Sequence, residues 1–447
     1  MATICGKGLP PRAAFLLALD FFCLVILAPL LFLGPDLATA SSMSFASTAW
    51  TLLRLMAAGL VCQTLVYYND LYNLQVVRRL REMFARSLRA FAWMLLALAI
   101  GWNFLIAYPL PLSKVLSFSA VLLCTAVLVR LFIVPRKRER VLILGSGEET
   151  ADLHEIVGEH PEWNVQVTAI MNPAAIDDYA SAELEPSLRF DRIIVCNGQP
   201  RRAKFLERLL GWKMHGLPVE DAHAFYERST GRVLIDGLTL EQCVFGGSSE
   251  TSAYLTKGKR AFDLIVATFL LILAAPIIAL VSLLLWSQGG GSVLFIQDRV
   301  GLHGKNFRIL KFRTMRVAPT TEGAKWATEE TNRITPLGRY LRKYRLDELL
   351  QLLNIIRGDM SLVGPRPEQP ALCKVLNESV PFYDLRHAVL PGLTGWAQVR
   401  YHYGAGIEES KRKLEYDLFY VRHASLWLDC AIAIETVKVV LVGRGAK

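Results

Sequence analysis

AFDLIVATFLLILAAPIIALVSLLLW, residues Ala261–Trp286, is the stretch that sets the architecture of this chain. At about 1.5 Å per residue, a helix of this length spans the roughly 30 Å apolar core of a bilayer. Pro276 lies near its middle, where proline removes a backbone hydrogen bond and bends a helix. The residues that follow are rich in lysine and arginine, and nothing in them indicates an exported domain. We therefore expect a re-entrant helix hairpin over residues 261–286 that breaks at Pro276 and leaves by the face it entered; a straight crossing is the alternative.

Four more apolar stretches precede this one, and each approaches the roughly 20 residues that a transmembrane helix needs. They are Ala13–Leu33, Phe45–Tyr67, Leu88–Tyr108 and Val115–Val134. Basic residues gather before the first, between the second and third, and after the fourth, whereas the other two loops carry few charges. Because positively charged loops stay in the cytoplasm, both ends of this predicted four-helix transmembrane domain, residues 1–139, face the cytoplasm.

The composition agrees with a membrane protein that handles anions. Of the 447 residues, 53% are hydrophobic, and the formal net charge is +10. In a chain this apolar, the positive charge favours a membrane surface or a phosphorylated substrate over nucleic acid. The eight cysteines include no C-x-x-C pair and no zinc-ligand spacing, so we expect reduced, non-ligating thiols.

A second domain begins where the composition changes, at Arg140. Short apolar strands alternate with helices, which predicts a Rossmann-like parallel α/β domain over residues 140–246, followed by a linker at 247–256. The predicted elements are strands at Val141–Leu144, Val165–Met171 and Arg192–Cys196, and a helix at Glu148–Val157. Gly145-Ser-Gly147 opens that helix as a dinucleotide fingerprint does, but Thr150 stands where the third glycine belongs. We therefore expect a structural or regulatory role for this domain, such as dimerisation or nucleotide sensing.

The candidate chemistry lies in Thr335–Pro367, TPLGRYLRKYRLDELLQLLNIIRGDMSLVGPRP. Thr335-Pro336 predicts a helix start. A helical wheel places the leucines on one face and Asp347, Gln351 and Asn354 on the opposite stripe, with Glu348 at its edge. Five arginines surround this acid pair: Arg339, Arg342, Arg345, Arg357 and Arg366. Arginines orient phosphates, one carboxylate can act as a nucleophile, and carboxylates with phosphate oxygens hold Mg²⁺. A solvated, salt-bridged helix face is the competing interpretation.

Five ordered motifs in residues 257–447 resemble the bacterial sugar transferases, the monotopic polyprenyl-phosphate hexose-1-phosphate transferases of exopolysaccharide and O-antigen synthesis. They are Gln297–Gly301, Lys311–Met315, Leu346–Leu349, Gly358–Pro367 and Pro391–Trp396. With four helices and an α/β domain in front, the whole chain is similar to the large subclass that includes undecaprenyl-phosphate galactose phosphotransferases. The resemblance implies a mainly α catalytic domain at the cytoplasmic face of a multi-pass protein of the bacterial inner membrane.

The resemblance also implies a ping-pong reaction in which a hexose-1-phosphate passes from a UDP-sugar to undecaprenyl phosphate and UMP is released. Asp347 matches the family nucleophile, Glu348 matches its acidic partner, and the pair would hold Mg²⁺. Arg342 and Arg366 match the phosphate-binding arginines. Further cations are expected at substrate phosphates or lipid headgroups: Lys259 and Arg260 at the entrance to the membrane hairpin, and Arg299, Lys311 and Arg313 after it.

Two other functions remain open from the sequence. A membrane-tethered nucleotide-sugar epimerase or dehydratase would need a Y-x-x-x-K pair, and no tyrosine here has lysine four residues later. A non-catalytic scaffold for polysaccharide assembly predicts loss of the acid pair or of the arginines, and all of them are present. The transferred sugar is not fixed by the sequence; Val317–Asn332 and Tyr401–Glu409 are the loops expected to select it. We expect a homodimer formed through the α/β domain.

Overall fold

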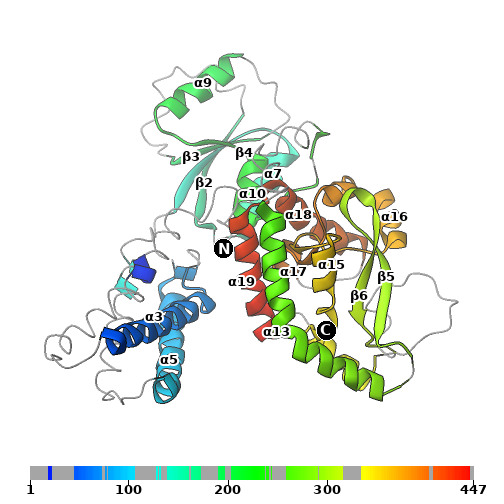
Figure 1. Cartoon of the computed structure of the whole chain (residues 1–447). Coiled ribbons are helices and arrows are strands. Elements are labelled where there is room, and N and C mark those ends of the chain that lie inside the picture. The colour runs from blue at the N-terminus through cyan, green and yellow to red at the C-terminus, as the bar shows by residue number, and fades with distance from the viewer. Residues whose placement is uncertain are drawn as a thin grey trace. The chain divides into compact units, whose positions relative to one another are not determined.

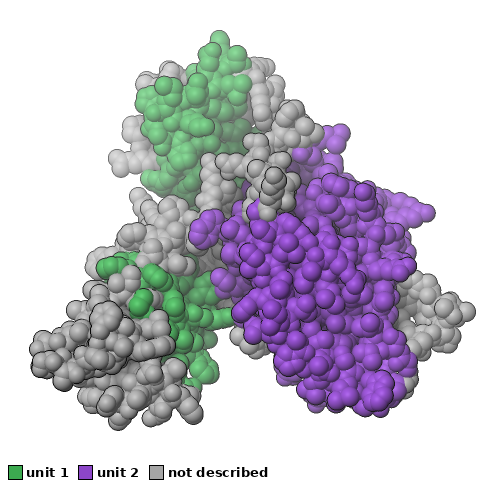
Figure 2. Space-filling view, viewed as in Figure 1, with its two compact units in different colours: residues 1–225 green, residues 226–447 purple. Residues whose placement is uncertain are grey.

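The computed structural model divides the chain into two compact units, residues 1–225 and residues 226–447, coloured separately in Figure 2. The structure describes residues 19–22, 45–72, 76–77, 79–105, 127–128, 130–131, 138–160, 163–172, 190–196, 203–236, 238–240, 243, 258–289, 291–315, 334–401 and 406–442. The expected linker at 247–256 and the expected loop Val317–Asn332 lie outside these ranges, as do residues 402–405 of the expected loop Tyr401–Glu409.

Two of the four predicted N-terminal membrane helices coincide with long helices. Helix α3 spans Phe45–Tyr68 and α5 spans Leu80–Leu105. The first and fourth predicted spans lie mostly outside the described residues. Within them, Arg130 of the fourth is buried and donates to Asp20 Oδ2 of the first at 2.7 Å, and also to the Leu71 carbonyl at 3.0 Å. The four-span topology stays a prediction.

The predicted parallel α/β fold is confirmed: the described residues form a parallel four-stranded sheet in the order β2-β1-β3-β4, while the domain bounds 140–246 stay a prediction. Its strands are β1 (Glu139–Leu144), β2 (Val165–Met171), β3 (Arg192–Val195) and β4 (Val219–Asp221), and its helices are α7 (Glu148–Glu159), α9 (Ala203–Met214) and α10 (Ala222–Thr230). β4 is a strand that the sequence analysis did not predict.

Side chains of β1 alternate between two cores because successive strand residues point to opposite faces of a sheet. Val141 and Ile143 pack with Leu153 of α7 on one face. Leu142 and Leu144 pack with Phe205 of α9 on the other. The sheet is therefore covered by helices on both faces, as its continuous apolar strands require.

The stretch that opened the sequence forms one helix, α13 (Lys259–Ser287), with Pro276 inside it. Figure 1 shows α13 bending partway along its length, as an internal proline favours. The structure thus corrects the expected break at Pro276: the helix bends but continues. The re-entrant path, in which the helix returns to the membrane face that it entered, stays a prediction.

Most of the surface of α13 is exposed and apolar. Its buried positions form a narrow stripe with spacings of four and seven residues: Lys259, Asp263, Ala267, Ala274, Val281 and Leu285. Outside the stripe, Ile265 is 70% exposed, Ile272 67% and Trp286 73%. Within the described ranges, α13 is the one helix that is long and apolar enough to cross a membrane. Such an apolar surface indicates contact with lipid rather than with water.

Apart from α13 and the 17-residue helices α18 and α19, the described elements of the second unit are short. A β-hairpin, β5 (Leu294–Val300) and β6 (Asn306–Phe312), follows α13, with the short turn η4 (Leu302–Gly304) at its tip. Next come α14 (Pro336–Lys343), η6 (Leu346–Glu348), α15 (Gln351–Arg357), β7 (Ser361–Val363), α16 (Pro370–Ser379), η7 (Tyr383–Ala388), β8 (Gly392–Thr394), α17 (Trp396–Arg400), α18 (Ile407–His423) and α19 (Leu426–Val442).

The first turn of α13 is tied to two of these elements by buried polar groups. Lys259 Nζ lies 2.5 Å from Asp429 Oδ2 on α19, which runs beside α13 in Figure 1. Tyr420 donates to the other Asp429 oxygen at 2.8 Å. Asp263 accepts a hydrogen bond from the Leu362 amide of β7 at 3.2 Å. The membrane helix is thereby fixed to the strand that leads into the candidate site.

Candidate active site

The acid pair lies just after a sharp backbone turn. Thr335 begins α14 as predicted, because its hydroxyl accepts from the Gly338 amide at 2.9 Å. The helix ends at Lys343, and Arg345 has a left-handed conformation with φ 55°. Asp347 and Glu348 follow in the 3₁₀ turn η6, 8% and 6% exposed. The expected continuous helix is therefore wrong, and so is the solvated-face alternative.

Glu348 is the carboxylate that the cations neutralise. Its Oε1 accepts from Arg366 Nη2 at 2.6 Å and from Lys311 Nζ at 3.0 Å. Its Oε2 lies 3.6 Å from Arg345 Nη1. Burial alone would raise the pKa of Glu348, but Arg366 and Lys311 hold it well below its usual range. Glu348 is consequently ionised at neutral pH.

Asp347 lacks such direct partners. Its Oδ1 is buried and has no hydrogen-bond partner among the described residues. Burial, and then the negative charge of Glu348, raises the pKa of Asp347. Lys311, Arg366 and Arg342 act in the opposite direction without reversing the shift. A proton added to the pair therefore goes to Asp347, while its ionised form is a poorly solvated and reactive carboxylate.

Two strands in close contact position Arg366. Gly364 follows β7, and a Cβ added there would lie 2.2 Å from the Leu390 carbonyl oxygen. A Cβ added at Gly392, on β8, would lie 2.1 Å from the Gly364 nitrogen. The glycines of the two sequence motifs thus allow the backbones to touch, and Gly364 donates to the Thr394 carbonyl at 2.9 Å.

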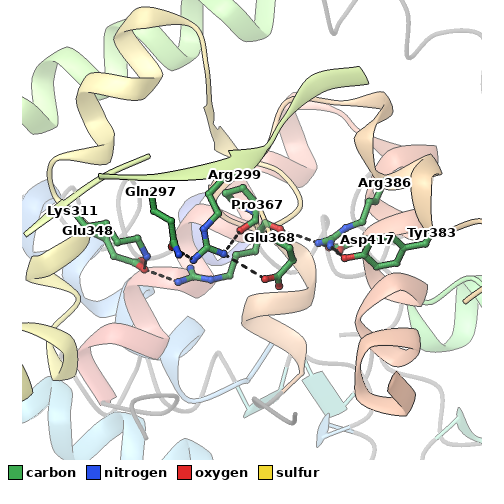
Figure 3. Close-up of polar contacts among 10 residues, drawn as sticks. Gln297, Arg299, Lys311, Glu348, Pro367, Glu368, Tyr383, Arg386 and Asp417 are labelled. Carbon is green, nitrogen blue, oxygen red and sulfur yellow. Dashed lines mark hydrogen bonds and ion pairs between the residues drawn. The ribbon is translucent and has the colours of Figure 1, made fainter. Parts of the chain in front are cut away.

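Two further arginines hold the segment that carries Arg366. Arg386 donates to the Arg366 carbonyl at 2.9 Å, and Arg299 donates to the Pro367 carbonyl at 3.1 Å. Arg299 also lies 3.6 Å from Glu368. Figure 3 shows these contacts as a row from Lys311 and Glu348, through Arg299, to the buried group of Arg386, Asp417 and Tyr383. Arg299 thus fixes the backbone next to Arg366 and does not contact the acid pair.

Asn354 attaches the strand that carries Lys311 to the helix that follows the acid pair. The Asn354 side chain is fully buried, accepts from the Leu310 amide at 3.0 Å and donates to the Arg308 carbonyl at 2.7 Å. It therefore satisfies both backbone groups of β6 on the edge that β5 leaves open. The register of β6 against α15 is fixed, and so is the place of Lys311 beside Glu348.

The structure brings together some predicted site residues and places others elsewhere. Asp347, Glu348, Lys311, Arg342 and Arg366 form the site. Lys259 pairs with Asp429, and Arg260 donates to the Ile355 and Ile356 carbonyls at 2.6 and 2.8 Å. Arg313 donates to the Gly289 carbonyl, just after α13, at 2.6 Å. These last three cations have internal acceptors that stabilise the fold around α13.

Several contributors to the site escaped sequence reasoning. Arg345 was noted only as one arginine of a run, and Asn354 only as a polar residue on the helical wheel. Arg386, Glu368 and Asp417 gave no signal, because their roles depend on contacts between residues far apart in the chain. For Asn354 a signal existed: a polar stripe that continues from the acid pair.

A magnesium ion fits these residues only if the substrate completes its coordination. Among the described residues, no group of three or more His, Cys, Asp or Glu side chains lies together. Asp347 Oδ1 is a buried carboxylate oxygen without a partner, and Mg²⁺ is commonly bound by one or two carboxylates with substrate phosphates. The donor set therefore suits an ion shared with a phosphorylated ligand.

The site is a buried acid pair surrounded by arginines and a lysine, which is the arrangement that phosphoryl transfer requires. The same unit carries the long apolar helix α13, which indicates that the site is associated with a membrane. The family model described as bacterial sugar transferase matches residues 254–443. The chain is 42% identical, over 191 residues, to the Bacillus subtilis (strain 168) protein named "Uncharacterized sugar transferase EpsL"; the match covers 42% of this chain and 89% of that protein. The chain belongs to the bacterial sugar transferase family.

Two longer relatives carry names that specify a reaction. The "UDP-N-acetylgalactosamine-undecaprenyl-phosphate N-acetylgalactosaminephosphotransferase" of Aeromonas hydrophila is 37% identical over 262 residues, which are 58% of this chain and 61% of that protein. The "Undecaprenyl-phosphate glucose phosphotransferase" of Komagataeibacter xylinus is 33% identical over 331 residues, 70% of this chain and 60% of that protein. The chain thus spans about three fifths of the length of each.

Proposed function

We propose that this protein transfers a sugar-1-phosphate from a UDP-sugar to undecaprenyl phosphate at the cytoplasmic face of the bacterial inner membrane, releasing UMP. The observation that carries the proposal is the buried Asp347–Glu348 pair, in which Glu348 alone takes the direct contacts of Arg366 and Lys311. The names of the two longer relatives support the donor and acceptor classes. They differ in the sugar, N-acetylgalactosamine in one and glucose in the other, so the proposal extends to a hexose or an N-acetylhexosamine.

In the first step, an ionised Asp347 oxygen attacks the phosphorus that bears the sugar. The Asp347–phosphorus bond forms as the bond to the UMP oxygen breaks, and the electron pair leaves with UMP. Arg342 and Arg366 are placed to neutralise the phosphate oxygens, and the buried acid pair beside them limits the screening of their charges by water. In the second step, a phosphate oxygen of undecaprenyl phosphate attacks the same phosphorus and displaces Asp347.

The place of the site relative to α13 supports a lipid acceptor. Asp263 of α13 holds β7, and β7 leads through Gly364 to Arg366. The apolar helix α13 is thus connected to Arg366 through the Asp263 hydrogen bond, β7 and Gly364. We propose that α13 enters the membrane as a re-entrant segment bent at Pro276, which keeps the acid pair at the level of the lipid phosphates.

Magnesium would be held by Asp347 and Glu348 together with the donor phosphates. When bound there, the ion would supply positive charge that neutralises the leaving UMP. The residues of the chain perform the rest: Lys311 and Arg366 keep Glu348 ionised, and the turn at Arg345 directs Asp347 into the site.

UMP release by the purified protein tests the proposal, with undecaprenyl phosphate, Mg²⁺ and a panel of UDP-sugars. We expect multiple turnovers with one sugar class only when the lipid is present, and complete loss in Asp347→Asn. Asp384→Asn is the matched control, since Asp384 lies on the surface with its side chain 72% exposed. Release that survives in Asp347→Asn would exclude Asp347 as the nucleophile, and no release from any sugar by folded protein would refute the reaction.

A further inference from the structure

Gln351 is a buried amide beside the acid pair with an unused donor. The residue is 2% exposed, and its Nε2 has no hydrogen-bond partner among the described residues. Leaving a buried N–H group unpaired costs on the order of 1–3 kcal/mol, so such groups are rare without a reason. A ligand that arrives later is one such reason.

The backbone places Gln351 on the side of the helix that faces the site. The backbone stays right-handed helical from η6 into α15, because Leu349 (φ −57°, ψ −31°) and Leu350 (φ −69°, ψ −15°) between them both have α-helical angles. Three residues before Gln351, Glu348 contacts Lys311 of β6; three residues after it, Asn354 bonds the β6 backbone. Residues three apart share a helix face, so Gln351 points to the same side as both.

Two neighbouring polar atoms are also buried without partners among the described residues. These are Nη1 of Arg342 and Oδ1 of Asp347. Arg342 lies in the last turn of α14, five residues before Asp347, and its positive charge acts on that carboxylate. Gln351 Nε2 and Arg342 Nη1 are thus unpaired N–H donors on the two segments that flank the acid pair, and an incoming anion would satisfy them by accepting a hydrogen bond from each.

We propose that Gln351 donates a hydrogen bond through Nε2 to a non-bridging oxygen of the phosphate that Asp347 attacks. The inference rests on the proposed transfer reaction and adds a substrate-contacting residue to it. The amide carries no charge, so it adds little to the binding of the donor. It aligns the phosphate and stabilises the negative charge that the oxygens carry in the transition state.

The test compares Gln351→Met, which keeps the shape and removes the donor, with Gln351→Glu, which puts an acceptor in its place. The measurement is the burst of UMP released from a UDP-sugar and Mg²⁺ without acceptor lipid, since one turnover reports the first step alone. We expect the burst rate of Gln351→Met to fall by about 100-fold or more, as when one oxyanion donor is removed, with KM for the donor nearly unchanged. The burst rate of Gln351→Glu falls further, because a carboxylate repels the phosphate.

A thermal melt without ligand separates this role from packing. Removing the unpaired donor in Gln351→Met should leave Tm unchanged or raise it by about 2–4 °C, whereas the loss of a structural hydrogen bond would lower it. A wild-type burst rate in Gln351→Met overturns the proposal, and so does a lowered Tm in that variant combined with a wild-type burst rate in Gln351→Glu. If the wild-type protein itself gives no burst, the proposed reaction fails, and that outcome is distinct from a failure at Gln351.

Discussion

Replacing Lys311 with methionine should shift the pH dependence of catalysis toward higher pH. Lys311 Nζ lies 3.0 Å from Glu348 Oε1, and Glu348 keeps Arg366 at 2.6 Å when Lys311 is gone. A hydrogen bond to a charged group contributes about 1.5–3 kcal/mol, and 1.36 kcal/mol corresponds to one pKa unit. The acid pair should therefore bind its first proton about 10- to 100-fold more tightly in Lys311→Met.

That proton goes to Asp347, because its pKa is already raised by burial and by the charge of Glu348. Only ionised Asp347 can attack, so activity is lost as pH falls through its pKa. The acidic limb of the kcat/KM profile for UMP release, measured from pH 5 to 9, should move up by about one unit or more in Lys311→Met.

Lys311→Arg is the matched control for this shift. It retains the positive charge, so its acidic limb should lie near that of the wild type even if its plateau is lower. A Lys311→Met enzyme whose plateau falls while its acidic limb stays in place would refute the electrostatic reasoning. Lys311 would then act on the substrate alone and not on the acid pair.

Three further predictions concern stability, each measured as Tm of the purified protein in detergent. Asn354→Leu removes two hydrogen bonds to partly buried backbone groups of β6 and should destabilise the protein by about 1–3 kcal/mol. The exposed Asn377→Leu should change stability by less than about 0.5 kcal/mol. Burial raises the pKa of Glu415 to about 7, whereas a glutamate in the unfolded chain has a pKa of about 4.3. The protonated Glu415 therefore contributes its full stabilisation below about pH 4.3, and this contribution is lost as pH rises through 7. Glu415→Gln should remove that pH dependence of Tm. Lys259→Met should cost about 3–5 kcal/mol by leaving Asp429 buried without its cation, and adding Asp429→Leu should recover part of the loss; an unchanged Tm in Lys259→Met would contradict that reasoning.

The α/β unit was predictable because its signals are local. Four consecutive apolar residues, Val141–Leu144, are typical of a strand covered on both faces, and the structure covers both. β4, Val219–Asp221, was not predictable in this way. It has three residues, two of them acidic, and it is a strand because Ile193 to Val195 of β3 pair with it.

The candidate site was predictable in its residues and not in its geometry. The wheel was drawn for one helix, but the chain takes a left-handed turn at Arg345, and arginine is not a residue type that marks such turns. The burial of the acid pair was equally hidden, because it depends on β6, which lies more than thirty residues earlier and is held there by Asn354. Local periodicity carries no information about such a distant neighbour.

The adjacent carboxylates Asp347 and Glu348 differ in their pKa because they have different neighbours, not because an aspartate differs from a glutamate. After the turn at Arg345, Glu348 points to Lys311 and Arg366, and both donate to the same oxygen. Those cations lower the pKa of Glu348, and the resulting fixed negative charge helps to raise the pKa of Asp347. A group that is strongly paired is a poor nucleophile, because attack would break its hydrogen bonds, whereas an unpaired buried carboxylate gains bonding by attacking. The pairing of Glu348 is therefore what leaves Asp347 available, and it supports the proposal of Asp347 as the nucleophile on physical grounds that are independent of family resemblance.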